Sequence, residues 1–92
     1  MEKIMELVEK IRRRNSYLCA VLEDYLHEAI RWGGSIPAYC ETWARTVIAE
    51  MFTVLEWVSD RSFIYAICIY DEIQRARRLL QKIRKITCYI PQ

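Results

Sequence analysis

The segment from Pro37 to Val58 carries apolar side chains around most of a helical circumference. These side chains are Cys40, Trp43, Ala44, Val47, Ile48, Met51, Phe52, Val54, Leu55 and Val58. The narrow strip expected to be exposed consists of Glu41, Arg45, Ala49, Thr53 and Glu56. A surface helix normally buries only one apolar stripe. We therefore expect this helix to be covered on nearly every side, by the rest of the chain and by a second copy or another protein.

The composition favours a single, densely packed helical domain spanning residues 1–92. Apolar residues make up 53% of the chain, and Gly and Pro number two each. Globular domains are usually about 45–50% apolar and contain more turn residues than this. A chain of this length has room for one domain with a modest core. The fold class expected is all-α, with three long helices.

The first expected helix covers residues 2–32. A stripe recurs along it at helical spacing: Ile4, Val8, Ile11, Asn15, Leu18, Leu22, Tyr25 and Ala29. No Gly or Pro interrupts this stretch, which predicts one continuous helix, with a break at Asn15–Ser16 as the alternative. Thirty-one residues extend about 46 Å, whereas a second helix over residues 37–59 extends about 35 Å. The first helix is therefore expected to overhang its neighbour.

Two breaks separate the expected helices. Gly33 suits the end of the first helix, Ser35 can cap the second, and Pro37 is tolerated in its first turn. The stretch from Ser59 to Ser62 is a weaker break, either a turn with Asp60 or Ser62 as helix cap or a kink. A third helix is expected over residues 62–85. The β-branched residues and Pro of residues 86–92 predict an extended tail.

The expected architecture is a helical hairpin with a third helix packed along it, completed by a symmetric dimer. The overhanging end of the first helix needs a cover, and a polar residue within an apolar seam can fix register or oligomeric state. The predicted dimer interface comprises Ile4, Val8, Ile11, Asn15, Trp43, Met51 and Phe52.

The basic residues form two clusters. The chain has a net charge of +2, but residues 61–92 hold seven Lys or Arg and two acidic residues, whereas residues 35–60 hold one and four. Basic side chains at helical spacing can meet phosphates along a duplex, although a solvated helix face has the same pattern. The predicted contacts to nucleic acid or an acidic partner are Arg12, Arg13, Arg14, Arg75, Arg78, Lys82 and Lys85.

Motifs for catalysis, metals or cofactors are not found, so no enzyme activity, metal or cofactor is expected. The single histidine, His27, follows Glu23 and Asp24, but a di-metal bundle repeats such an element and adds further carboxylates. The glycine pair at Gly33 lacks a phosphate-binding pattern. The four cysteines have none of the close spacing typical of zinc sites, and the sequence leaves their redox state open: Cys19, Cys40, Cys68 and Cys88.

The function expected from these features is structural. We expect a non-enzymatic adaptor that binds another protein and itself, as a homodimer. The alternative is a small nucleic-acid-binding protein with little sequence specificity. Residues 1–14 lack the apolar core of a secretion signal, and no stretch is long enough to span a bilayer, so a cytoplasmic location is expected. One Asn and three Gln among many charged residues are a weak sign of a thermophilic source.

Overall fold

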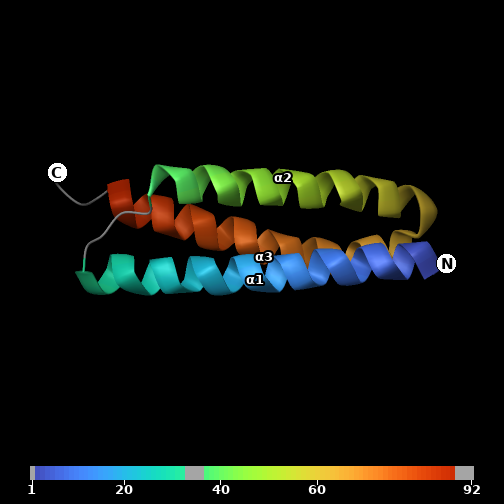
Figure 1. Ribbon diagram of the computed structural model, residues 1–92, viewed down its shortest axis with the longest axis horizontal. Helices are drawn as coiled ribbons and strands as arrows, with labels where there is room; N and C mark the ends of the chain where they lie inside the picture. The colour runs from blue at the N-terminus through green and yellow to red at the C-terminus, as the bar shows by residue number, and fades with distance from the viewer. Residues whose placement is uncertain (1, 33–36, 89–92) are drawn as a thin grey trace.

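The computed structural model describes residues 2–32 and 37–88, which form three α-helices packed along one another (Figure 1). The helices are α1 (Glu2–Trp32), α2 (Ala38–Arg61) and α3 (Phe63–Cys88). The principal extents of the molecule are 50 × 20 × 17 Å. Helices α1 and α3 run in the same direction and α2 runs against both. The expected all-α fold with three long helices is therefore confirmed.

Helix α1 is continuous through Asn15, so the alternative with a break at this residue is wrong. The Asn15 side chain, which breaks helices when it bonds to its own backbone, instead donates a hydrogen bond to α3. The predicted overhang of α1 is also absent at its first turns. The Tyr65 hydroxyl donates to Met5 Sδ at 3.5 Å, which places the first turns of α1 beside those of α3.

Helix α2 begins after Pro37 and ends at Arg61, two residues later than predicted. Pro37 has φ −58° and ψ 142°, and its carbonyl accepts the N–H groups of Cys40 and Glu41. The chain then reverses at Ser62, which is extended with φ −154° and ψ 95°. A turn, rather than a kink, therefore separates α2 from α3. Asp60 lies inside α2 and is not a cap of α3.

Helix α3 continues to Cys88, so the prediction of an extended tail from residue 86 is wrong for residues 86–88. Ile86 is half-buried. The helix-propensity cost of a β-branched residue is only tenths of a kcal/mol, which packing of this kind can offset. The rest of the predicted tail, residues 89–92, and the predicted turn residues Gly33 and Ser35 lie outside the described residues.

One apolar core runs the length of the bundle. Helix α3 packs extensively against both α1 and α2, whereas α1 and α2 touch each other least. The largest fully buried side chains of this core are Leu18, Leu22, Val47, Met51, Val58, Ile69, Ile73 and Ile83. The apolar arc of α2 is broad because it faces both other helices. Because α1 and α2 make few contacts, apolar side chains remain accessible between them.

Candidate functional site

The first candidate surface runs along the line where α2 packs against α3, and we call it the α2–α3 groove. Its apolar half has a volume of about 450 Å³. The residues lining this half are Phe52, Leu55, Glu56, Ser59, Phe63, Ala66, Ile67, Tyr70 and Asp71. Phe52 and Tyr70 meet edge to face with their ring centroids 6.0 Å apart. The Gln74 amide donates to the Tyr70 hydroxyl at 2.7 Å, which orients the phenol.

Large apolar side chains on the first two turns of α3 point away from the core. Phe63 is 68% exposed, Ile64 75% and Ile67 52%. Ala66, Ile69 and Ile73, which form the neighbouring stripe of the same helix, are buried. Contiguous apolar surface of this kind is typical of a site where another molecule binds.

The second half of the α2–α3 groove is basic. It has a volume of about 340 Å³ and is lined by Arg45, Ile48, Ala49, Phe52, Arg77, Leu80, Gln81 and Arg84. Arg45 and Arg84 both pair with Glu41, at 2.9 and 3.2 Å. The Arg77 guanidinium lies 5.9 Å from the centre of the Phe52 ring. Both halves lie between α2 and α3 and adjoin at Phe52, with acidic residues at the apolar end and arginines at the other end.

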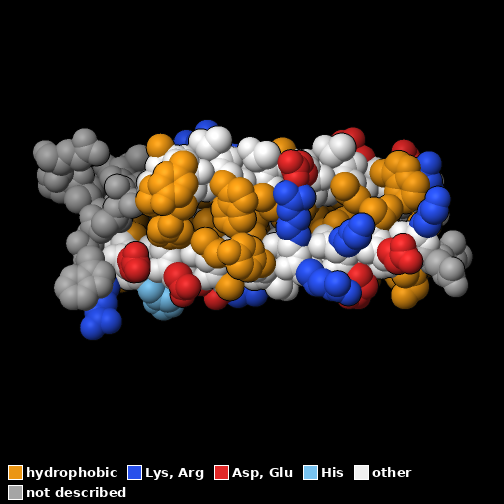
Figure 2. Space-filling model, in the orientation of Figure 1, with side chains coloured by type: hydrophobic (Ala, Val, Ile, Leu, Met, Phe, Trp, Pro, Cys, Tyr) orange, Lys and Arg blue, Asp and Glu red, His pale blue; other side chains and the backbone are white. Residues whose placement is uncertain are grey.

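The second candidate surface lies between α1 and α2 and faces the viewer in Figure 2, where apolar side chains gather between the two helices. We call it the α1–α2 aromatic surface. The Tyr17 and Trp43 rings meet edge to face with centroids 6.1 Å apart, and Tyr39 nearby on α2 is 75% exposed. The Arg14–Glu50 ion pair, at 2.6 Å, links the same two helices. Exposed Tyr and Trp are the residues most enriched at binding hot spots.

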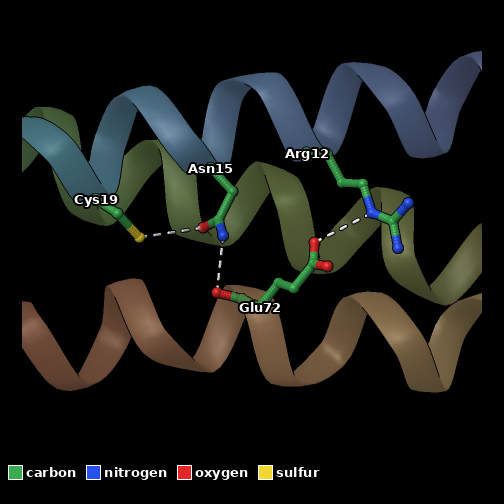
Figure 3. A network of polar contacts seen from close by, with 4 residues as sticks. All are labelled: Arg12, Asn15, Cys19 and Glu72. Carbon is green, nitrogen blue, oxygen red and sulfur yellow. Dashed lines mark hydrogen bonds and ion pairs between the residues drawn. The ribbon is translucent and has the colours of Figure 1, made fainter.

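A buried polar contact fixes α1 against α3 (Figure 3). Asn15 is only 6% exposed, and its Nδ2 donates to the Glu72 backbone carbonyl at 2.7 Å. The Cys19 thiol points at Asn15 Oδ1 at 4.0 Å, and Arg12 pairs with the Glu72 carboxylate at 3.2 Å. Removing a partner of a buried polar group costs about 1–3 kcal/mol. This contact therefore favours one register of α1 along α3.

A second polar contact joins α1 and α2. The Tyr25 hydroxyl and Cys40 Sγ lie 3.0 Å apart. The hydrogen bond to Cys40 raises the pKa of Tyr25 to about 12, with burial adding to the effect. A raised pKa means that the neutral phenol is favoured in the folded state, and either the hydroxyl or the thiol can donate in this contact. Burial raises the pKa of the Cys19 thiol, which disfavours the reactive thiolate.

Most of the predicted dimer-interface residues lie in the interior of a single chain. Ile4, Val8, Ile11, Asn15 and Met51 are all buried there. They are covered by the chain's own helices, so within this fold they are not available to a second subunit. Phe52 and Trp43 remain partly exposed, and they lie on two different surfaces.

The predicted basic contact residues fall into separate places. Arg12 and Arg75 line the same groove between α1 and α3, whereas Arg14 lies on the α2 side of α1. All three pair with a carboxylate: Arg12 with Glu72, Arg14 with Glu50 and Arg75 with Glu23. Arg13, Arg78, Lys82 and Lys85 are exposed, and among the described residues none of these four forms an ion pair. The two predicted clusters therefore meet at Arg12 and Arg75, where both side chains are paired with carboxylates, and Arg14 lies on a different side of α1.

Sequence reasoning missed the exposed apolar face of α3. Phe63, Ile67 and Tyr70 recur at the spacing of one helix face, beside the stripe that contains Ala66 and Ile69. That second stripe was the available signal, but it indicated burial rather than a surface. The hydrogen-bond partner of Asn15 could not be predicted from the sequence, because it is a backbone carbonyl, a group that every residue carries.

Within residues 2–32 and 37–88, no group of three or more potential metal ligands occurs, and no helix is long and apolar enough to cross a membrane. His27 is exposed on α1. Among the described side chains, Cys19, Cys40 and Cys68 are free thiols, and the Cys88 side chain lies outside this set. No protein-family model, curated protein or solved structure matches this chain.

Proposed function

We propose that this chain is a non-enzymatic helical-bundle adaptor that forms a homodimer and binds another protein. The observation that carries this proposal is the presence of two separate exposed apolar surfaces, the α2–α3 groove and the α1–α2 aromatic surface. An adaptor needs one surface for self-association and another for its partner. A cytoplasmic location is also part of the proposal.

Light scattering after gel filtration tests the homodimer. We expect a mass twice that of the 11.1 kDa chain, falling towards one chain on dilution. Ile67→Asp places a charge on the α2–α3 groove and is expected to weaken association by roughly a hundredfold. Ile30→Asp is the matched control, because Ile30 is an exposed isoleucine on α1 that lines neither half of this groove. A wild-type chain that stays monomeric at millimolar concentration would overturn the homodimer.

Site-specific crosslinking tests the second surface. A photoreactive amino acid in place of Tyr39 is expected to yield one adduct in the source cells, with a mass that is not a multiple of the chain's own. The same amino acid in place of Glu9, an exposed residue on α1 two turns away from Tyr17, is the control. Adducts that are equal at both positions, or that contain only this chain, would contradict an adaptor role for this surface.

Nucleic-acid binding is the second candidate function. It is favoured by Arg78, Lys82 and Lys85, which lie at helical spacing on α3, are exposed and form no ion pair among the described residues. Three such contacts are expected to give a slope of about −3 in a plot of log affinity against log salt concentration. Binding should show little dependence on sequence.

Fluorescence anisotropy with unrelated duplexes at low salt tests this candidate. The triple variant Arg78→Glu, Lys82→Glu, Lys85→Glu is expected to lose binding. The control variant Lys3→Glu, Lys10→Glu, Arg61→Glu changes the same number of exposed basic residues, none of which is a predicted nucleic-acid contact. Lack of binding by the wild-type chain at low salt would exclude the nucleic-acid function and leave the adaptor.

A further inference from the structure

We infer that the occupant of the α2–α3 groove is the same groove of a second copy, packed in the opposite direction about a twofold axis that passes near Phe52 and Tyr70. This inference rests on the proposed homodimer and adds where the two chains meet and how they are oriented. Homodimers usually have such isologous contacts, in which the same patch appears on both sides.

The distribution of charge along the groove argues for a second copy in this orientation. Glu56 and Asp71 line the apolar half, and Arg45, Arg77 and Arg84 line the other half. Glu41 pairs with Arg45 and Arg84, which leaves the basic half with an excess of positive charge. Two antiparallel copies place each acidic end against a basic end, whereas two parallel copies place like charges together. Like charges opposed at an interface are strongly unfavourable.

The position of the aromatic pair sets the centre of the contact. Phe52 lines both halves of the groove, and Tyr70 lies against it with its ring orientation fixed by Gln74. A twofold axis near this pair brings the aromatic rings of both copies together at the middle of the interface. Buried aromatic residues at the centre and charged residues at the rim match the usual anatomy of interfaces.

The same arrangement covers the exposed start of α3. Phe63 and Ile67 lie at the acidic end, so they would pack on the basic end of the other copy, where Leu80, Ala49 and the aliphatic part of Arg77 line the groove. Ile64 lines neither half of the groove. We therefore expect Ile64 to stay accessible in the dimer while Phe63 and Ile67 become protected.

A charge swap tests the orientation. Glu56→Lys alone and Arg77→Glu alone are each expected to weaken the homodimer by roughly tenfold, because each places like charges together at both ends of the interface. The double variant carrying both changes restores the opposite-charge contacts, so its homodimer is expected to recover. An equimolar mixture of the two single variants should form the heterodimer in preference to either homodimer.

Native mass spectrometry of the mixture and sedimentation of each variant provide the readouts, and circular dichroism checks that each variant keeps its helices. The matched controls are Asp24→Lys and Arg13→Glu, which reverse the charge at exposed positions on α1. Each should leave the dimer unchanged, and a mixture of the two should contain homodimers and heterodimer in statistical proportions. A wild-type dimer with no recovery in the double variant and no preference for the heterodimer would overturn the antiparallel groove contact and leave the homodimer standing. A monomeric wild-type chain would overturn the homodimer itself.

Discussion

In the first half of α3, apolar residues lie on both sides of the helix, in opposite environments. On the inner side, Ile69 and Ile73 are completely buried, whereas on the outer side Ile64 is 75% exposed. The residue type is the same and the helix is the same, so neither hydrophobicity nor helix propensity separates the two sides. The difference shows that the inner residues stabilise the single chain, whereas Ile64 adds little to its packing.

The largest expected effect is the difference in stability between shortening a buried isoleucine and shortening an exposed one on α3. Ile73→Ala is expected to lower the free energy of unfolding by about 2–5 kcal/mol, because it leaves a cavity in a closely packed core. Ile64→Ala is expected to change it by less than about 0.5 kcal/mol. Urea unfolding followed by circular dichroism at one fixed protein concentration measures both. Equal effects of the two substitutions would remove the distinction between the two sides.

The polar contact between α1 and α3 is expected to have the next largest effect. Asn15→Ala removes the hydrogen bond to the Glu72 carbonyl and leaves a small void, at a cost of about 1–3 kcal/mol in the free energy of unfolding. Ser16→Ala is the matched control, because Ser16 lines the same groove but is exposed. If Asn15→Ala costs no more than Ser16→Ala in urea unfolding, this contact does not stabilise the seam between α1 and α3.

The rim of the same seam should contribute less than its centre. Arg12 and Glu72 form an ion pair at 3.2 Å between side chains that are 43% and 42% exposed. Exposed pairs of this kind are worth about 0.2–1 kcal/mol. A double-mutant cycle with Arg12→Ala and Glu72→Ala measures the coupling, which should decrease at high salt. A coupling larger than the cost of Asn15→Ala would reverse the expected order of centre and rim.

The smallest expected effect concerns the contact between Tyr25 of α1 and Cys40 of α2, and it depends on pH. The pKa of Tyr25 is raised to about 12 from an ordinary value near 10, so the folded state holds the phenolic proton more tightly than the unfolded state. The stability gained from this hydrogen bond is fully present below pH 10 and is lost as the pH rises through 12.

Unfolding of Tyr25→Phe and the wild-type chain between pH 8 and pH 12 measures this contribution. The difference in stability between the two proteins should shrink over the upper part of the range. Tyr39→Phe, at an exposed tyrosine, should show no such change. A difference for Tyr25→Phe that does not vary with pH would mean that the hydrogen bond to Cys40 does not control the phenol.

The sequence predicted the helices better than the surfaces. The periodic stripe of α1 and the lack of Gly and Pro predicted a continuous helix of the correct length. The same reasoning assigned Ile4, Val8 and Ile11 to a second subunit, because helix lengths alone do not show that the core of the single chain buries these residues. The exposure of Phe63 and Ile64 was not predicted. Apolar residues around a helix show how much apolar surface the helix has, but not which of these residues the fold leaves exposed.

The amino-acid sequence by itself determined three long helices and an excess of apolar surface, because helix periodicity and the scarcity of Gly and Pro are local properties of the chain. The tertiary structure decided which apolar residues the chain buries and which remain exposed. It also paired Asn15 with a backbone carbonyl of α3 and separated Arg12 from Arg14. These outcomes depend on the direction and rotation of each helix against its neighbours, which result from contacts between residues far apart in the sequence.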